Sequence, residues 1–178
     1  MTLLHYFNKK ENKDKLFAKD IYSEIIYLVK KIIQDLPNNL EKNFRTSFEI
    51  TTILLFSIFY ISKENAYKTN NLLSQEIMNY FIEDLDRYFR EQGIGDMNIG
   101  KYVKSYVKKF YFRVKKLEIL FENINEENIK SYLEDLKIIK TKENIIKMPI
   151  SLCNIINELT YRSVKHPINK ELFINIYI

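Results

Sequence analysis

The chain offers very few points at which a helix would have to stop. Its 178 residues include only three glycines and three prolines, the two residues that destabilise a helix interior most. Apolar residues recur every three or four positions between short polar segments, which is the spacing of one helix face. With 46% hydrophobic residues, the chain can also bury a sizeable core. We therefore predict an all-α fold, a single compact domain of about six helices.

The periodic segments indicate where these helices lie. They cover about residues 15–36, 41–62, 70–93 and 96–121, followed by one helix that starts at Asn125 and one over 149–163. The helix over 41–62 is apolar on most sides and should lie at the centre. Its longest apolar run, residues 50–61, is about half of the roughly 20 residues that span a bilayer. A buried core helix is therefore the better interpretation.

Residues that favour caps or turns mark the expected helix ends. Gly93 is followed by apolar Ile94, which suits a left-handed residue in a Schellman motif. An Asn, Asp or Ser side chain caps a helix N-terminus, and Pro suits the first helical position. The other expected ends are Pro37 after the first helix, Asp96 or Asn98 before the fourth, Asn125 before the fifth and Pro149 at the start of the sixth.

The two ends of the chain differ from its middle. Residues 1–14 are polar over most of their length and are expected to form a flexible N-terminus without a secretory or transit signal. Residues 15–165 form the predicted helical domain. Residues 166–178 form an apolar tail, for which a short helix, a docked segment and a strand all remain open.

Positive charge is concentrated on the fourth predicted helix. Seven basic residues and no acidic one lie between positions 101 and 116, so the rest of this chain of net charge +5 carries −2. At 100° per residue Lys101, Lys104, Lys108 and Lys115 form one stripe, apart from the apolar face that contains Phe110. The stripe is either a solvated surface or a binding surface for an anionic partner, ribosomal RNA or acidic lipid headgroups.

Acidic residues cluster on the third predicted helix. Asp84 and Asp86 point in nearly opposite directions, which disfavours a shared magnesium diphosphate site. Asp86 with Arg90, and Glu83 with Arg87, have the spacing of helix ion pairs. We also consider a polar network that pins the turn over residues 93–100. Its members would be Arg90, Glu91, Asp96 and Arg113.

Residues 75–114, QEIMNYFIEDLDRYFREQGIGDMNIGKYVKSYVKKFYFRV, carry a more specific signal. This segment resembles the signature of the ubiquinol–cytochrome c chaperone family, and a weaker resemblance extends over about residues 16–162. Phe112 departs from it, because the family usually has glycine there. The matching residues are Gln75, Asp84, Asp86, Arg90, Glu91, Gly93, Gly95, Asp96, Gly100, Lys101, Val103, Lys104, Phe110, Tyr111 and Arg113.

The resemblance implies an all-α protein that catalyses no reaction. It implies binding of newly made cytochrome b and its delivery to the cytochrome bc1 complex. Relatives in mitochondria act with a small partner protein and associate with the ribosome near its exit tunnel. A bacterial member would work in the cytoplasm, peripherally at the inner face of the cytoplasmic membrane. We expect no DNA binding.

The remaining residues give little support to catalysis. Neither His5 nor His166 has Cys or carboxylate neighbours at metal-ligand spacing, and no phosphate-binding or nucleophile motif is present. We expect no metal and no cofactor. Cys153 lies among apolar residues and should be a buried thiol.

Three functions can be compared. A chaperone requires an exposed apolar groove, bordered here by the lysine stripe. The alternative is an RNA- or ribosome-binding helical module that shields no client. The third is a helical enzyme of the isoprenoid type, which requires a deep cavity lined by acids.

Overall fold

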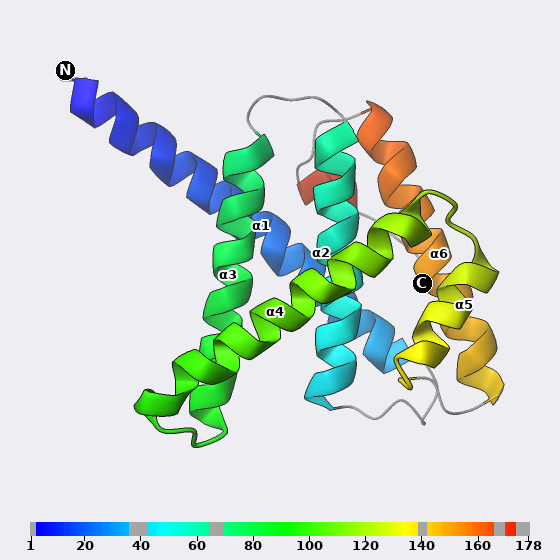
Figure 1. Cartoon of the computed structure of the whole chain (residues 1–178). Coiled ribbons are helices and arrows are strands. Elements are labelled where there is room, and N and C mark those ends of the chain that lie inside the picture. Colours follow the sequence, from blue (N-terminus) through cyan, green and yellow to red (C-terminus); the bar gives the residue numbers. More distant parts are fainter. Residues whose placement is uncertain (1–2, 36–42, 65–69, 139–141, 166–169, 174–178) are drawn as a thin grey trace.

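The computed structural model in Figure 1 describes residues 3–35, 43–64, 70–138, 142–165 and 170–173. The described residues form six α-helices and one short 3₁₀ helix and contain no strand, which confirms the all-α prediction. The helices are α1 (Leu3–Asp35), α2 (Phe44–Glu64), α3 (Asn70–Glu91), α4 (Asp96–Phe121), α5 (Glu126–Asp135) and α6 (Lys142–Lys165), and the 3₁₀ helix is η1 (Lys170–Phe173).

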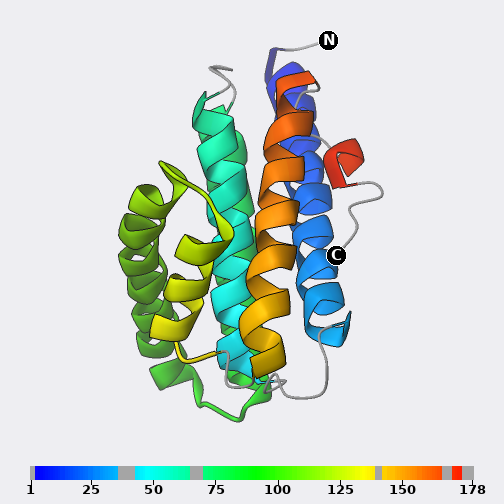
Figure 2. The ribbon, with the colours of Figure 1, turned by 90° about the vertical axis from the view of Figure 1, so that its right-hand side faces the viewer.

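The helices form three layers around α2. In Figure 1, α3, α2 and α6 stand side by side, α4 crosses in front of α3 and α2, and α1 runs behind them. Figure 2 shows the same order from the side, with α4 and α5 on one face of α2 and α1 on the other. Helix α2 contacts α1, α3, α4 and α6. Its predicted central position is confirmed.

The core contains the apolar faces that the periodicity predicted. Ile21, Ile25 and Ile32 of α1 are fully buried, as is Ile77 of α3. Helix α2 is long and apolar enough to cross a membrane over Phe44–Lys63, yet 72% of this apolar segment is buried inside the bundle. A core helix of a globular domain has this property, because it is covered by its neighbours on most sides. Cys153 is buried, as expected.

Two predicted helix ends are confirmed in detail. Gly93 has a φ of +76°, its N–H donates to the Arg90 carbonyl at 2.9 Å, and the Ile94 N–H donates to the Phe89 carbonyl at 3.2 Å. These two bonds define a Schellman motif. The Asn125 side chain accepts a hydrogen bond from the Asn128 N–H at 2.9 Å and caps α5.

Other predicted boundaries were wrong. Helix α1 begins at Leu3 and not near Lys15, and whether residues 1–14 are flexible stays a prediction. Gly95 occupies the N-cap of α4, so Asp96 lies in the first turn. Pro149 lies inside α6, whose first turns precede it. Met148 and Pro149 are both buried, so packing against the core outweighs the hydrogen bond that proline removes.

Within the predicted tail, the structure describes residues 170–173, which form the short docked helix η1. Leu172 and Phe173 of η1 are buried in the core and are 1% and 6% exposed. Apolar burial of this kind holds a single turn that is too short to be stable alone. Pro37 and His166 lie outside the described residues, and the side chain of His5 is not described.

Candidate functional site

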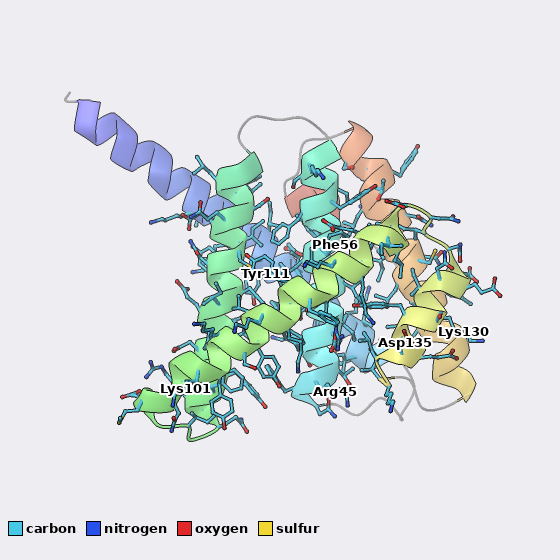
Figure 3. The ribbon with its side chains drawn as sticks, in the orientation of Figure 1. Arg45, Phe56, Lys101, Tyr111, Lys130 and Asp135 are labelled. Atoms are coloured by element: carbon cyan, nitrogen blue, oxygen red, sulfur yellow. The ribbon has the colours of Figure 1, made fainter. Side chains whose placement is uncertain are left out.

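A groove opens between α2, α3 and α4. Its volume is about 940 Å³, near the upper end of the roughly 300–1,000 Å³ of binding sites in proteins. In Figure 3 Phe56 of α2 and Tyr111 of α4 lie along the same edge of α4, in the region between α2 and α3. The lining residues are Phe56, Phe59, Tyr60, Lys63, Ser74, Gln75, Met78, Asn79, Ile82, Phe110, Tyr111, Val114, Glu118 and Glu122.

The floor of the groove is aromatic and aliphatic. Phe56 and Phe110 are buried, and Phe59, Met78 and Val114 are half-buried. The Phe110 ring contacts the Phe59 ring edge-on, with 6.4 Å between ring centroids. Such edge-to-face contacts fix aromatic rings in place. The groove is therefore built into the core packing between the three helices.

Its margin is polar and slightly acidic. The exposed charged side chains that line the groove are Lys63, Glu118 and Glu122. The sequence predicted a groove bordered by the lysine stripe, and this was wrong. Lys101, Lys104, Lys108 and Lys115 are all exposed on α4, but none of them lines the groove. The groove and the stripe are two separate surfaces that share one helix.

A buried ion pair fixes α4 against the central helix. The Arg113 guanidinium donates Nε–H to Glu49 Oε2 and Nη2–H to Glu49 Oε1, both at 2.9 Å. The Glu49 side chain is 2% exposed and that of Arg113 is 16% exposed. The hydrogen bonds to Glu49 raise the pKa of Arg113 above its usual range. A bidentate pair of this kind sets the rotation and register of α4, and with them the position of Phe110 and Tyr111.

Glu49 was missed in the sequence. It is the only acidic residue between Arg45 and Lys63, in an otherwise apolar stretch, and an isolated charge in a core helix needs a buried partner. That signal indicated an ion pair, but it did not say which of the basic residues supplies the partner.

A second set of charges holds the turn between α3 and α4. Arg90 pairs with Asp86 and with Asp96, each at 2.5 Å, and these bonds raise its pKa. The predicted network is thus confirmed for Arg90 and Asp96. It was wrong for Arg113, which pairs with Glu49 elsewhere, and Glu91 is exposed to solvent.

Asp84 joins α3 to α1. It accepts a hydrogen bond from the Tyr22 hydroxyl at 2.6 Å and forms an ion pair with Arg87, so Asp84 and not the predicted Glu83 is the partner of Arg87. Burial raises the pKa of Tyr22 above its usual range. Asp84 and Asp86 thus bind different partners, as the opposite directions of their side chains predicted.

The family comparison agrees with the resemblance seen in the sequence. The model of the family described as ubiquinol–cytochrome c chaperone matches residues 38–135, more than half of the chain. The chain belongs to this chaperone family. Its fold is similar to a solved structure described as the Cbp3 homolog from Brucella abortus, with a TM-score of 0.73 and 19% identity over 89% of this chain and 88% of that one. No curated protein matches the chain.

Membership of the ubiquinol–cytochrome c chaperone family supports a chaperone role in assembly of the cytochrome bc1 complex. The family segment contributes to several parts of the structure. Gln75, Phe110 and Tyr111 line the groove, whereas Gly93 ends α3 and Gly95 caps α4. That any of these residues contacts a partner stays a prediction.

The other expected site residues of this chaperone-family chain lie along the exposed surface of α4. Gly100 is exposed, and a Cβ added there would meet no atom within 4 Å. Lys101 lies near the N-terminal end of the helix (Figure 3). Among the described residues, no group of three or more His, Cys, Asp or Glu side chains could hold a metal ion.

Proposed function

We propose that the groove between α2, α3 and α4 binds an apolar segment of newly made cytochrome b and releases it into the assembling cytochrome bc1 complex. The observation that carries this proposal is an open groove of about 940 Å³ with an aromatic and aliphatic floor in a chain of a chaperone family. A newly made membrane protein exposes apolar helices whose burial in such a groove is favourable.

The floor suits a client that is held for a limited time. Met78 and the aromatic rings of Tyr60 and Tyr111 are half-buried or exposed, so they can adjust to different apolar side chains. A helix laid in the groove would present side chains at every third or fourth position to this floor. The groove binds by covering apolar surface, and the proposed function requires no reaction at any of these residues.

The polar margin favours release. Lys63, Glu118 and Glu122 remain hydrated at the edge, where charged groups add little affinity. Binding then depends mainly on apolar area, so the client leaves when its own partner subunits offer a larger apolar surface. We place this activity at the cytoplasmic face of the membrane into which cytochrome b is inserted.

Tyr111 provides the test. Its side chain is 56% exposed, so Tyr111→Asp should leave the fold intact while it adds a charge to the groove. We expect about tenfold less cytochrome b recovered with the purified protein, and a lower bc1 level in cells. An aromatic side chain at such a surface contributes about 1–2 kcal/mol or more, which corresponds to roughly a tenfold change in affinity.

The matched control is Tyr27→Asp, which adds the same charge to a tyrosine of α1 that is 61% exposed and does not line the groove. It should leave both readouts unchanged. Equal losses for the two variants, or no loss for Tyr111→Asp, would remove the groove from the mechanism.

A further inference from the structure

The outer face of α4 combines exposed lysines with exposed large apolar side chains. Met97 is 94% exposed, Ile119 is 72% exposed and Phe112 is 56% exposed. At 100° per residue these three side chains and Lys101, Lys104, Lys108 and Lys115 fall within a sector of about 80°. The sector extends over about 33 Å of helix from Met97 to Ile119. We refer to it as the outer α4 face.

This face carries positive charge with little compensation. After Asp96, which pairs with Arg90, the next acidic residue in α4 is Glu118, and Glu122 follows at the C-cap. Both line the groove. Lys116 adds a further cation beside the apolar part of the face, with its ammonium 5.7 Å from the centroid of the Phe112 ring. The Arg113 guanidinium carbon is 5.9 Å from the same ring, but its charge is paired with Glu49.

A partner for this face must offer both negative charge and an apolar interior. An anionic lipid bilayer offers both, because lysines reach its headgroups while aliphatic and aromatic side chains enter the boundary with the acyl chains. RNA offers negative charge and stacking for aromatic rings, but it offers nothing that would cover Met97 and Ile119. The exposed aliphatic side chains therefore favour the membrane.

We propose that the outer α4 face docks the protein on an anionic lipid surface, with α4 parallel to the membrane plane. The four lysines lie at the level of the lipid phosphates, and Met97, Phe112 and Ile119 insert below them. The groove-lining side of α4 adjoins this face: Tyr111 lies about 20° beyond the Lys104 edge of the sector, and Val114 lies about 80° beyond it. The groove therefore opens beside the membrane, and the docking requires no client in it.

The first experiment measures partition of the purified full chain onto vesicles of phosphatidylglycerol and phosphatidylcholine. A lysine near an anionic surface contributes about 1 kcal/mol, a factor of roughly five. Replacing Lys104, Lys108 and Lys115 with Gln should therefore weaken partition about a hundredfold. The matched control replaces exposed Lys19, Lys30 and Lys137 with Gln and should change partition less than about threefold.

Salt and lipid charge provide a second prediction from the same assay. Partition should fall steeply between about 0.15 M and about 1 M salt, because the Debye length decreases from about 8 Å to about 3 Å. It should be weak on vesicles of phosphatidylcholine alone, since three inserted side chains without the lysine contribution bind only marginally.

The second experiment tests insertion directly and uses the absence of tryptophan from this chain. Phe112→Trp places a single reporter in the outer α4 face, and Tyr27→Trp places one at an equally exposed site on α1. With anionic vesicles we expect a blue shift and quenching by brominated lipid for the first variant and neither for the second. Phe112→Trp fluorescence that stays unchanged would overturn the proposal. So would binding to a ribosomal RNA fragment that needs the same lysines while vesicles fail to bind, since that result assigns the face to RNA.

Discussion

The buried pair between Arg113 and Glu49 allows a quantitative prediction for the placement of α4. Two hydrogen bonds of 2.9 Å join the side chains, and only 2% of the Glu49 side chain is exposed. In Arg113→Met the carboxylate remains buried without its partner, which costs about 3–5 kcal/mol. That is a large part of the roughly 5–15 kcal/mol that stabilises a domain of this size.

Removing the other partner of the pair should cost less stability. In Glu49→Leu the charge left behind is that of Arg113, whose side chain is 16% exposed and can turn its guanidinium toward water. We expect a loss of about 2 kcal/mol. The double variant Arg113→Met with Glu49→Leu leaves no charge in the core, and it should lie within about 1 kcal/mol of the unaltered chain. The single losses sum to at least about 5 kcal/mol, so the two changes compensate each other by at least about 4 kcal/mol.

Urea unfolding followed by far-ultraviolet circular dichroism measures all four proteins. The slope of free energy against urea should be the same for each, so that differences in midpoint report stability. A loss of less than about 1 kcal/mol in Arg113→Met would refute the reasoning, because it would mean that water screens the pair. A double variant as unstable as the sum of the single variants would refute it as well.

The remaining predictions concern hydrogen bonds, pH and glycine, all measured by urea unfolding. Tyr22→Phe loses the bond to Asp84 and should cost about 1–2 kcal/mol, whereas Tyr132→Phe should cost nothing or stabilise, because the buried Tyr132 hydroxyl has no hydrogen-bond partner among the described residues. Burial raises the pKa of both phenols. The stability that their protonated forms contribute is therefore complete below about pH 10 and falls above it by up to about 1.4 kcal/mol per pH unit for each tyrosine. Either Phe variant should flatten that decline, and an unchanged slope in both would contradict the raised pKa values. Gly93→Ala should destabilise the fold by about 1 kcal/mol because position 93 has a positive φ. Gly100→Ala, in open space inside α4, should stabilise the fold by about 0.5–1 kcal/mol. Effects of the same sign at the two glycines would contradict these predictions.

Helix positions and inward faces could be predicted from the sequence because both depend on local spacing. The buried Ile77, Phe81 and Phe89 of α3 follow the 3.6-residue period, and Gly93 ends the helix through its own backbone preference. Pro149 shows where local preference fails. Its buried position in α6 is stabilised by contacts with distant parts of the chain, which no local pattern records.

The site was predictable only in part, because many of its contacts join residues that lie far apart in the sequence. The sequence correctly placed Arg90 beside Asp96, since the two residues flank one short turn. Arg113 was assigned to that turn, yet it pairs with Glu49, which lies 64 positions earlier. The groove also depends on how three helices pack. The sequence alone therefore did not show that α2 and α3 contribute to its lining, or that the lysines of the stripe do not line it.

Site-specific photocrosslinking during synthesis of cytochrome b tests the central claim most directly. A photoreactive phenylalanine analogue replaces Tyr111 in the groove or, as a control, the equally exposed Tyr27 on α1. We predict crosslinks from position 111 to the apolar segments of cytochrome b and none from position 27. Crosslinks of equal strength from both positions, or none from position 111, would contradict the claim that this groove holds the client.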